Sequence, residues 1–185
     1  MSDDPSPRWT ISQRIIHWLT ALCVLIAAGI ALYLLNPPDW SEPYVRRYYA
    51  GIAYHKLLGV TGLALVLLLA ALGKRGRRRP GGPIMRFAAA GVQVCLILFT
   101  ALSAFSGYIA NSFFGGALWL PGLGSLPSPL PYNESLGGLF TSAHQWLAYG
   151  VLFLIALHVV AALTHLFVLR DDVFSAMVTG GRREE

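Results

Sequence analysis

Four long apolar segments constrain the fold of this 185-residue chain more than any other feature. They cover residues 12–35, 51–73, 84–110 and 141–169, and each is long enough to cross a bilayer, which takes roughly 20 residues of helix. Only 12% of the residues are charged, against roughly 25% in soluble domains. The connections and tails leave no room for a separate soluble domain. The sequence therefore predicts one all-α domain, a transmembrane four-helix bundle embedded in the lipid bilayer.

The first apolar segment is expected to stay in the mature protein. It is longer than the 7–15 apolar residues of a signal peptide, it carries His17 and Trp18, and no A-x-A cleavage pattern follows it. We therefore interpret it as the first membrane span.

The positions of the basic residues predict the orientation of the spans. Eleven of the fourteen Lys and Arg residues lie beside the start of the first span, in the connection 74–86, or after the last span. Only Arg46, Arg47 and Lys56 fall on the opposite side. Because positively charged residues favour the cytoplasmic side, both termini are predicted to be cytoplasmic. The net charge of +5 follows from this topology, and no nucleic-acid binding is predicted.

All five histidines lie inside the apolar segments. An ionisable side chain in a membrane span is costly and usually faces a cofactor, a cavity or a partner. No Asp or Glu lies in any predicted span, so these imidazoles are best explained as neutral metal ligands, with haem iron as the leading candidate. The five residues are His17, His55, His144, His158 and His165.

The two cysteines do not suggest covalent haem attachment. Cys23 and Cys95 lie singly within spans, and the chain has no C-x-x-C-H motif. A disulfide is possible in principle, but buried small apolar residues are the favoured interpretation.

Spacing along the last span suits two cofactors. His144 and His158 are fourteen residues apart, so they lie about 40° apart around a helix and ~21 Å apart along its axis. Small residues follow the histidines at helical spacing and would let a flat macrocycle approach the backbone, although such residues also serve ordinary helix packing in membranes. Examples are Ala21, Val24 and Ala28 after His17, Gly59 and Gly62 after His55, and Ala148 after His144.

Depth in the membrane suggests how the histidines pair. His55 and His144 each begin a span near the outer face and form a consistent outer pair. The inner partner of His17 stays open between His158 and His165. His158 keeps the two sites within the hydrocarbon core and close to each other, whereas depth counted from the span ends fits His165 slightly better.

Four motifs together resemble the prokaryotic cytochrome b561 family of di-haem membrane cytochromes b. They are R-x-x-x-x-Q-R-x-x-H-W from Arg8 to Trp18, H-x-x-x-G from His55 to Gly59, S-G-Y-I from Ser106 to Ile109, and H-x13-H-x6-H from His144 to His165. The family is related to the cytochrome b subunits of formate dehydrogenases and nickel–iron hydrogenases. The motifs cover nearly the whole chain.

The resemblance implies two haem b groups in a bacterial inner-membrane protein. His55 and His144 would bind the outer haem, and His17 and His158 the inner one. His165 would lie beside a cytoplasmic-side site for ubiquinone or another quinone, with Arg170 nearby to favour an anionic form of the bound molecule. Haem propionates are expected to pair with basic residues, and the candidates are Arg14, Arg46, Arg47 and Lys56.

Three functions compete at this point. The first is an oxidoreductase that links the quinone pool to a small redox substrate at the outer face, and the resemblance implies superoxide as one such substrate. The second is a cytochrome b subunit that exchanges electrons with a periplasmic or membrane partner enzyme. The third is a non-haem metal transporter, which usually needs intramembrane carboxylates that this chain lacks.

The segment 111–140 carries no family motif that would identify the outer substrate or partner. It is rich in Pro, Gly and Ser and is predicted to be a long outer loop, with a short helix capped at Asn133.

Overall fold

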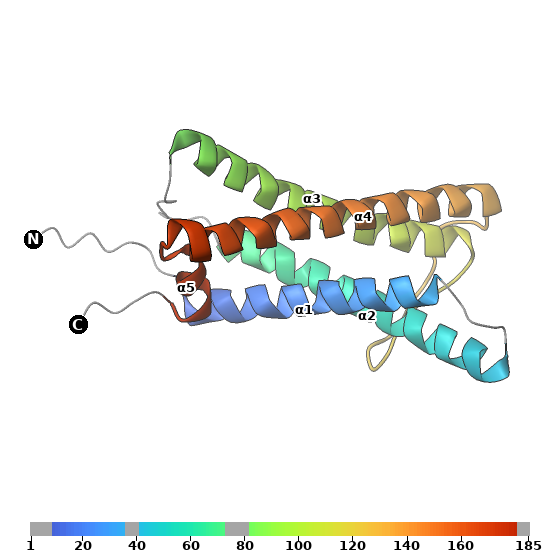
Figure 1. The fold of residues 1–185 in the computed structure, drawn as a ribbon. Coiled ribbons are helices and arrows are strands. Elements are labelled where there is room, and N and C mark those ends of the chain that lie inside the picture. Colours follow the sequence, from blue (N-terminus) through green and yellow to red (C-terminus); the bar gives the residue numbers. More distant parts are fainter. Residues whose placement is uncertain (1–8, 36–40, 73–81, 181–185) are drawn as a thin grey trace, which may run out of the picture.

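Four long helices form the molecule, as the computed structural model shows for residues 9–35, 41–72 and 82–180 (Figure 1). The helices are α1 (Ile11–Leu34), α2 (Glu42–Leu72), α3 (Pro83–Phe113) and α4 (Glu134–Thr164). Each is long and apolar enough to cross a membrane, and α4 continues apolar to Leu169. The predicted all-α transmembrane bundle is confirmed. The basic run from Lys74 to Arg79 lies outside the described residues.

Two helices extend well beyond the apolar segments that revealed them. α2 begins at Glu42 rather than near residue 51, and α4 begins at Glu134 rather than near residue 141. Asn133 is a cap, and its side chain accepts a hydrogen bond from the Leu136 amide at 3.0 Å. The prediction of a separate short helix there was wrong, because this cap starts α4 itself. Hydropathy marks only the part of a helix that suits lipid, whereas polar residues can continue the helix into the headgroup region.

The start of α1 is fixed by local and tertiary hydrogen bonds. Thr10 and Gln13 form a reciprocal capping box, with both bonds at 3.2 Å. The Gln13 side chain also donates to the Leu72 carbonyl at 2.8 Å. Because this bond satisfies a carbonyl in the last turn of α2, it ties the beginning of α1 to the end of α2.

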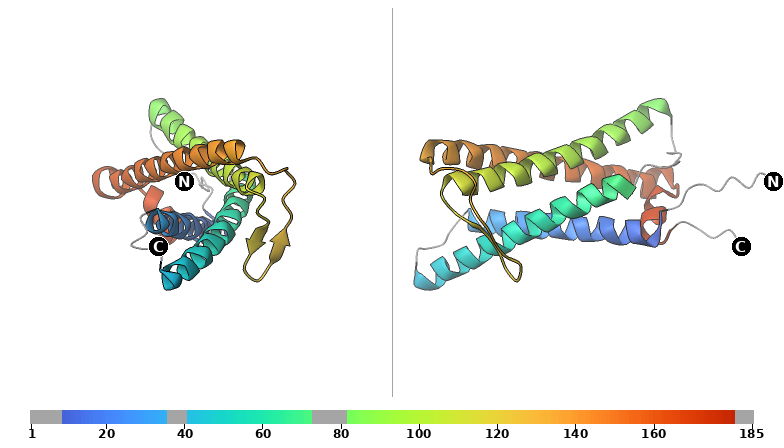
Figure 2. Two further views of the ribbon diagram at one scale, coloured as in Figure 1. Left: turned by 90° about the vertical axis from the view of Figure 1, so that its right-hand side faces the viewer. Right: turned by 180° about the vertical axis from the view of Figure 1, so that it is seen from behind.

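The bundle consists of two helical hairpins. α1 packs closely against α2 and α3 against α4, whereas α2 and α3 contact each other less extensively (Figure 2). Glycine permits the close approach in both hairpins. A Cβ at Gly62 would lie 3.3 Å from Val24 Cγ2, and a Cβ at Gly150 would lie 2.6 Å from two carbons of the Phe99 ring. Small residues at helix contacts are the usual device for packing in a bilayer.

Substituting Gly150 by alanine should destabilise the bundle. The new methyl group would displace the Phe99 ring between α3 and α4, and overpacking of this kind costs roughly 1–3 kcal/mol. Gly138→Ala is the matched control, because Gly138 lies in the same helix with no atom within 4 Å of the added Cβ. Thermal unfolding in detergent should show a lower midpoint for Gly150→Ala only. Equal midpoints would mean that Phe99 moves aside without cost.

The connection between α3 and α4 is more ordered than the predicted loop. It forms a two-stranded antiparallel hairpin, β1 (Leu118–Leu120) and β2 (Gly124–Leu126), which contacts α2 through β1. Leu118 and Leu120 are buried. Gly122 and Gly124 have φ of 77° and 96°, values that suit glycine in a tight turn. The connection therefore folds back along the bundle (Figure 2).

Few side chains are fully buried, and many large apolar ones are exposed. Phe87, Trp146 and Phe153, for example, are 82%, 75% and 63% exposed. Apolar faces of this extent match helices whose surroundings are lipid rather than water. Cys23 and Cys95 are free thiols and only half-buried, so the expectation of full burial was wrong. The reason is that a four-helix bundle has little interior, and most helix faces look outward.

Candidate functional site

Four of the five histidines meet in two pairs. The rings of His17 on α1 and His158 on α4 have centroids 6.1 Å apart, and those of His55 on α2 and His144 on α4 have centroids 5.9 Å apart. Both members of each pair come from different hairpins. The pairs are separated along α4 by the fourteen-residue step from His144 to His158, or ~21 Å of helix.

Backbone carbonyls hold both rings of the His55–His144 pair. His55 Nδ1 lies 2.9 Å from the Ala27 carbonyl of α1, and His144 Nδ1 lies 2.7 Å from the Ser103 carbonyl of α3. The Ser106 hydroxyl, in the S-G-Y-I motif, donates to the same Ser103 carbonyl at 2.9 Å. Because Nδ1 donates to a carbonyl in each case, the unprotonated Nε2 of each ring is left to bind a metal.

Glycines leave room beside this pair in different ways. A Cβ at Gly107 would lie only 3.0 Å from His144 Nδ1, so this glycine lets the imidazole reach the α3 backbone. A Cβ at Gly59, one turn after His55, would meet no atom within 4 Å. Gly62 instead packs against Val24 of α1. The suggestion that Gly62 makes room for a macrocycle was therefore wrong, since it serves helix packing.

The His17–His158 pair is held differently. His17 Nδ1 is buried and has no hydrogen-bond partner among the described residues. Trp18 lies edge-on to the His17 ring, with centroids 5.2 Å apart. A buried imidazole nitrogen without a partner is costly in a protein interior. Its presence in the space between the hairpins indicates a position prepared for a bound group.

The dimensions of both pairs fit a metal between two imidazoles. A metal–imidazole bond is about 2 Å long and the ring centre lies about 1 Å beyond the nitrogen, so two rings on one metal have centroids about 6 Å apart. Both observed separations match this value. The backbones of α1 and α4 make few direct contacts, whereas the rings of His17 and His158 meet in the space between these two helices. The residues present therefore fit haem iron with an imidazole on each side.

Comparison with known proteins identifies the family. Residues 8–180 match the family model of prokaryotic cytochrome b561. This chain belongs to the prokaryotic cytochrome b561 family. It is 26% identical to cytochrome b561 homolog 2 of Escherichia coli strain K12, over 92% of this chain and 91% of that protein. It is also 29% identical to the probable superoxide oxidase CybB of Yersinia pestis, over 92% of this chain and 96% of that protein.

Membership in the cytochrome b561 family decides the general role. With four helices able to cross a membrane, the chain is a multi-pass membrane protein with a cytochrome b electron-transfer role. The family implies haem b, and this agrees with the two histidine pairs.

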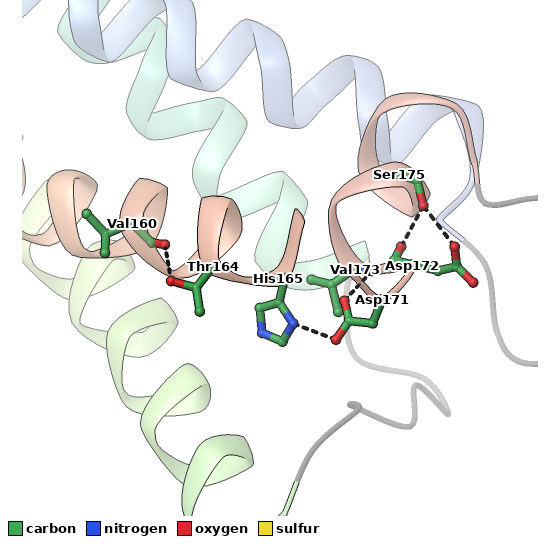
Figure 3. Close-up of polar contacts among 7 residues, drawn as sticks. All are labelled: Val160, Thr164, His165, Asp171, Asp172, Val173 and Ser175. Atoms are coloured by element: carbon green, nitrogen blue, oxygen red, sulfur yellow. Dashed lines mark hydrogen bonds and ion pairs between the residues drawn. The ribbon is translucent and has the colours of Figure 1, made fainter. Parts of the chain in front are cut away.

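The fifth histidine lies at a break in α4. The helix widens to a π-helix over His165–Leu169 and ends at Arg170, which has left-handed backbone angles (φ 52°, ψ 37°). His165 Nδ1 lies 2.7 Å from Asp171 Oδ2 (Figure 3). Widened turns of this kind are frequent at functional sites. A carboxylate, rather than Arg170, is therefore the charged group in contact with His165.

The structure alters the expected place of Arg170. In a continuous helix, Arg170 would lie a little over one turn beyond His165. The helix does not continue that far, and Arg170 is an exposed end residue. Its contribution to a site at His165 therefore has no support in the described contacts.

The four candidate partners of haem propionates lie in different surroundings. The Arg14 guanidinium donates to the Val178 carbonyl of α5 (Val173–Val178) at 2.9 Å. Arg46 forms an exposed ion pair with Glu42, and such pairs contribute little. Lys56 donates to Asn111 Oδ1 at 2.6 Å and thereby links α2 to the end of α3. Arg47 lines a groove of about 410 Å³ between α1 and α2 with Tyr33 and Gly51 among others.

Sequence reasoning missed the groups that orient the histidines. The carbonyls of Ala27 and Ser103 carry no side-chain signal, so no pattern could have identified them. Ser106 and Gly107 belong to the S-G-Y-I motif, but the motif alone does not predict that Ser106 donates to the Ser103 carbonyl or that Gly107 lies against the His144 ring. Asp171 had a usable signal, because it is the first acidic residue after the last apolar segment.

Proposed function

We propose that the protein carries electrons across the membrane through two haem b groups, from a small redox substrate at the outer face to the quinone pool. His55 and His144 would hold the outer haem, and His17 and His158 the inner one. Superoxide is the proposed outer substrate, by analogy with the probable superoxide oxidase of Yersinia pestis.

The observation that carries this proposal is the repetition of one arrangement at two depths. Two imidazole pairs with nearly the same ring separation lie on facing hairpins, and both use α4. A single structural histidine pair would need no second copy. Two pairs in succession suit two electron carriers that exchange electrons along the bundle axis.

Haem iron, when bound, supplies a one-electron carrier whose potential depends on axial ligands, hydrogen bonding and burial. The protein's residues provide the rest. His55 and His144 are oriented by the Ala27 and Ser103 carbonyls, so that the Nε2 atoms of both rings would hold the iron. With an imidazole from each residue on the iron, the outer substrate would not need to bind the metal.

His165 is proposed to contact quinone at the inner end of the pathway. His165 lies seven residues beyond His158. This spacing puts the two residues about 20° apart around the helix axis and ~10 Å apart along it. Its ring is half-buried. An imidazole in that position can exchange a proton with a quinone oxygen, which quinone reduction requires.

We propose that the protein lies in the bacterial inner membrane with both termini in the cytoplasm. α1 begins and α4 ends at the same end of the bundle (Figure 1). Arg14, Arg86 and Arg170 belong to that end or to the connection beside it, and the excess of basic residues there supports a cytoplasmic location.

The test uses purified protein in detergent or liposomes. We expect two haem b per chain by pyridine haemochrome analysis. A superoxide-generating system should reduce the haems and then a short-chain ubiquinone, and superoxide dismutase should suppress both reductions. One haem or none per chain would overturn the di-haem proposal.

The same test separates the alternative, a subunit that serves a partner enzyme. If the protein has two haems that quinol reduces but superoxide does not, the redox partner at the outer face is another protein, which accepts the electrons. The β1–β2 hairpin, together with the Lys56–Asn111 contact between α2 and the end of α3, would then be the candidate surface for docking that protein.

A further inference from the structure

We propose that Asp171 is a positioning residue for His165, which fixes the ring so that its second nitrogen, Nε2, faces quinone. The inference rests on the proposed function of His165 as the quinone contact. It adds a residue that sequence spacing would have placed elsewhere. In a continuous α-helix, residue 171 would lie about 120° around the axis and ~9 Å along it from residue 165, too far for contact.

The end of α4 is shaped to bring Asp171 back to His165. The π-helical turn over His165–Leu169 and the left-handed residue Arg170 reverse the chain, so that the Asp171 amide donates to the His165 carbonyl at 3.2 Å. Arg170 is the only described residue other than glycine with a positive φ. Left-handed conformations are unfavourable for side chains like this one, and the ion pair is a contact that the reversal makes possible.

The carboxylate of Asp171 divides its two oxygens between two tasks. Oδ2 contacts His165 Nδ1 at 2.7 Å, and Oδ1 accepts from the Val173 amide at 3.1 Å (Figure 3). The second bond holds the carboxylate to the start of α5. The Arg14 side chain then binds the Val178 carbonyl at the other end of α5. His165 is thereby positioned through Asp171 and α5 relative to α1, the helix that carries His17.

Hydrogen bonding at Nδ1 decides what Nε2 can do. A ring that donates from Nδ1 to a carboxylate has Nε2 as its free position, and Nε2 makes no hydrogen bond within the described part of the chain. Histidine paired with a carboxylate through Nδ1 is held in one orientation and in one tautomer. The side chains of His165 and Asp171 are 15% and 29% exposed, so water only partly competes for the pair.

Quinone becomes quinol by accepting two electrons, which bound haem would supply one at a time, and two protons. One proton leaves Nε2 of the His165 ring when both ring nitrogens are protonated: the N–H bond breaks as an O–H bond of the quinol forms. Water at the cytoplasmic surface supplies the other proton. Asp171 keeps the remaining proton on Nδ1, and water at the cytoplasmic surface returns a proton to Nε2.

The decisive variant is Asp171→Asn. Asparagine keeps an oxygen that can accept from the Val173 amide, so α5 should stay in place. It removes the charge beside His165, and its amide can donate to Nδ1 and shift the proton to Nε2. We expect stopped-flow oxidation of dithionite-reduced haems by a short-chain ubiquinone to slow roughly tenfold or more, the lower range for a proton-transfer group. The loss should appear in kcat rather than KM.

The matched control is Asp172→Asn. Asp172 is the neighbouring carboxylate, but it contacts Ser175 at 3.2 Å and not His165. The Asp172→Asn variant should leave the rate of haem oxidation by ubiquinone unchanged. Both Asp171→Asn and Asp172→Asn should retain wild-type haem spectra. Asp171→Glu should recover part of the rate. Nitrogen-15 NMR of histidine-labelled protein should show Nδ1-protonated His165 in wild type and a shift toward Nε2 protonation in Asp171→Asn, with His165→Gln used to assign the signal.

The outcomes separate this inference from the proposed function. If His165→Ala oxidises at the wild-type rate, the quinone contact itself is wrong. If His165→Ala is slow while Asp171→Asn is fast and keeps the wild-type nitrogen spectrum, only the positioning role is overturned. A slow Asp171→Asn with an unchanged nitrogen spectrum would also overturn it, because Asp171 would then act on something other than the ring.

Discussion

Replacing His144 with alanine should reduce the haem content from two per chain to one, with loss of the outer haem. The reason is that, in the proposed arrangement, both imidazoles would be needed to hold the outer iron, and His55 alone would hold it only weakly. His55→Ala should give the same result. The measurements are haemochrome stoichiometry and reduced-minus-oxidised spectra of purified protein. Both variants should lose superoxide-driven reduction of the remaining haem.

Two controls sharpen this prediction. Trp146→Phe changes a side chain that is 75% exposed, two residues from His144 on the same helix, and should keep both haems. Added imidazole should restore part of the outer haem in His144→Ala, because the cavity left by the ring would accept it. If His144→Ala keeps two haems with unchanged spectra, the His55–His144 pair is a structural contact.

Replacing His158 with alanine should remove the inner haem and abolish quinone reduction. Electrons reaching the outer haem would then have no carrier over the ~21 Å of α4 that separates His144 from His158. His17→Ala should likewise lose the inner haem and quinone reduction. Haem content, spectra and stopped-flow oxidation by ubiquinone provide the measurements. The outer haem should still be reduced by superoxide.

His165→Ala is the matched comparison for His158→Ala. It should retain both haems but slow their oxidation by quinone, because the altered ring contacts Asp171 rather than the His17 ring. A loss of haem in His165→Ala, with both haems kept in His158→Ala, would reverse the two assignments.

Much of the candidate site was accessible from the sequence because helical periodicity is a local property. The fourteen-residue step from His144 to His158 places two ligand candidates on one face of any straight helix. The alternation of spans then predicts that His55 meets His144 at one end, and their rings are 5.9 Å apart. The helix bounds were less accessible, because α2 and α4 continue beyond the apolar residues that mark them.

The partner of His17 could not be decided in this way. Depth alone left His158 and His165 open, since both lie within reach of the inner end of the bundle. In the structure His158 faces His17, whereas His165 begins the π-helical turn and contacts Asp171. The choice depends on where α1 approaches α4, which the spacing of residues within α4 does not determine.

The sequence by itself determined the membrane-spanning all-α fold and the presence of histidines at two depths. These follow from apolar segment length and from the fixed rise and turn of a helix, which each segment carries independently of the others. Only the tertiary structure decided which histidine rings meet, which carbonyls hold them, and that Asp171 returns to His165. Those contacts join residues on different helices or across a helix end, and helix packing and chain reversal, rather than local periodicity, set their positions.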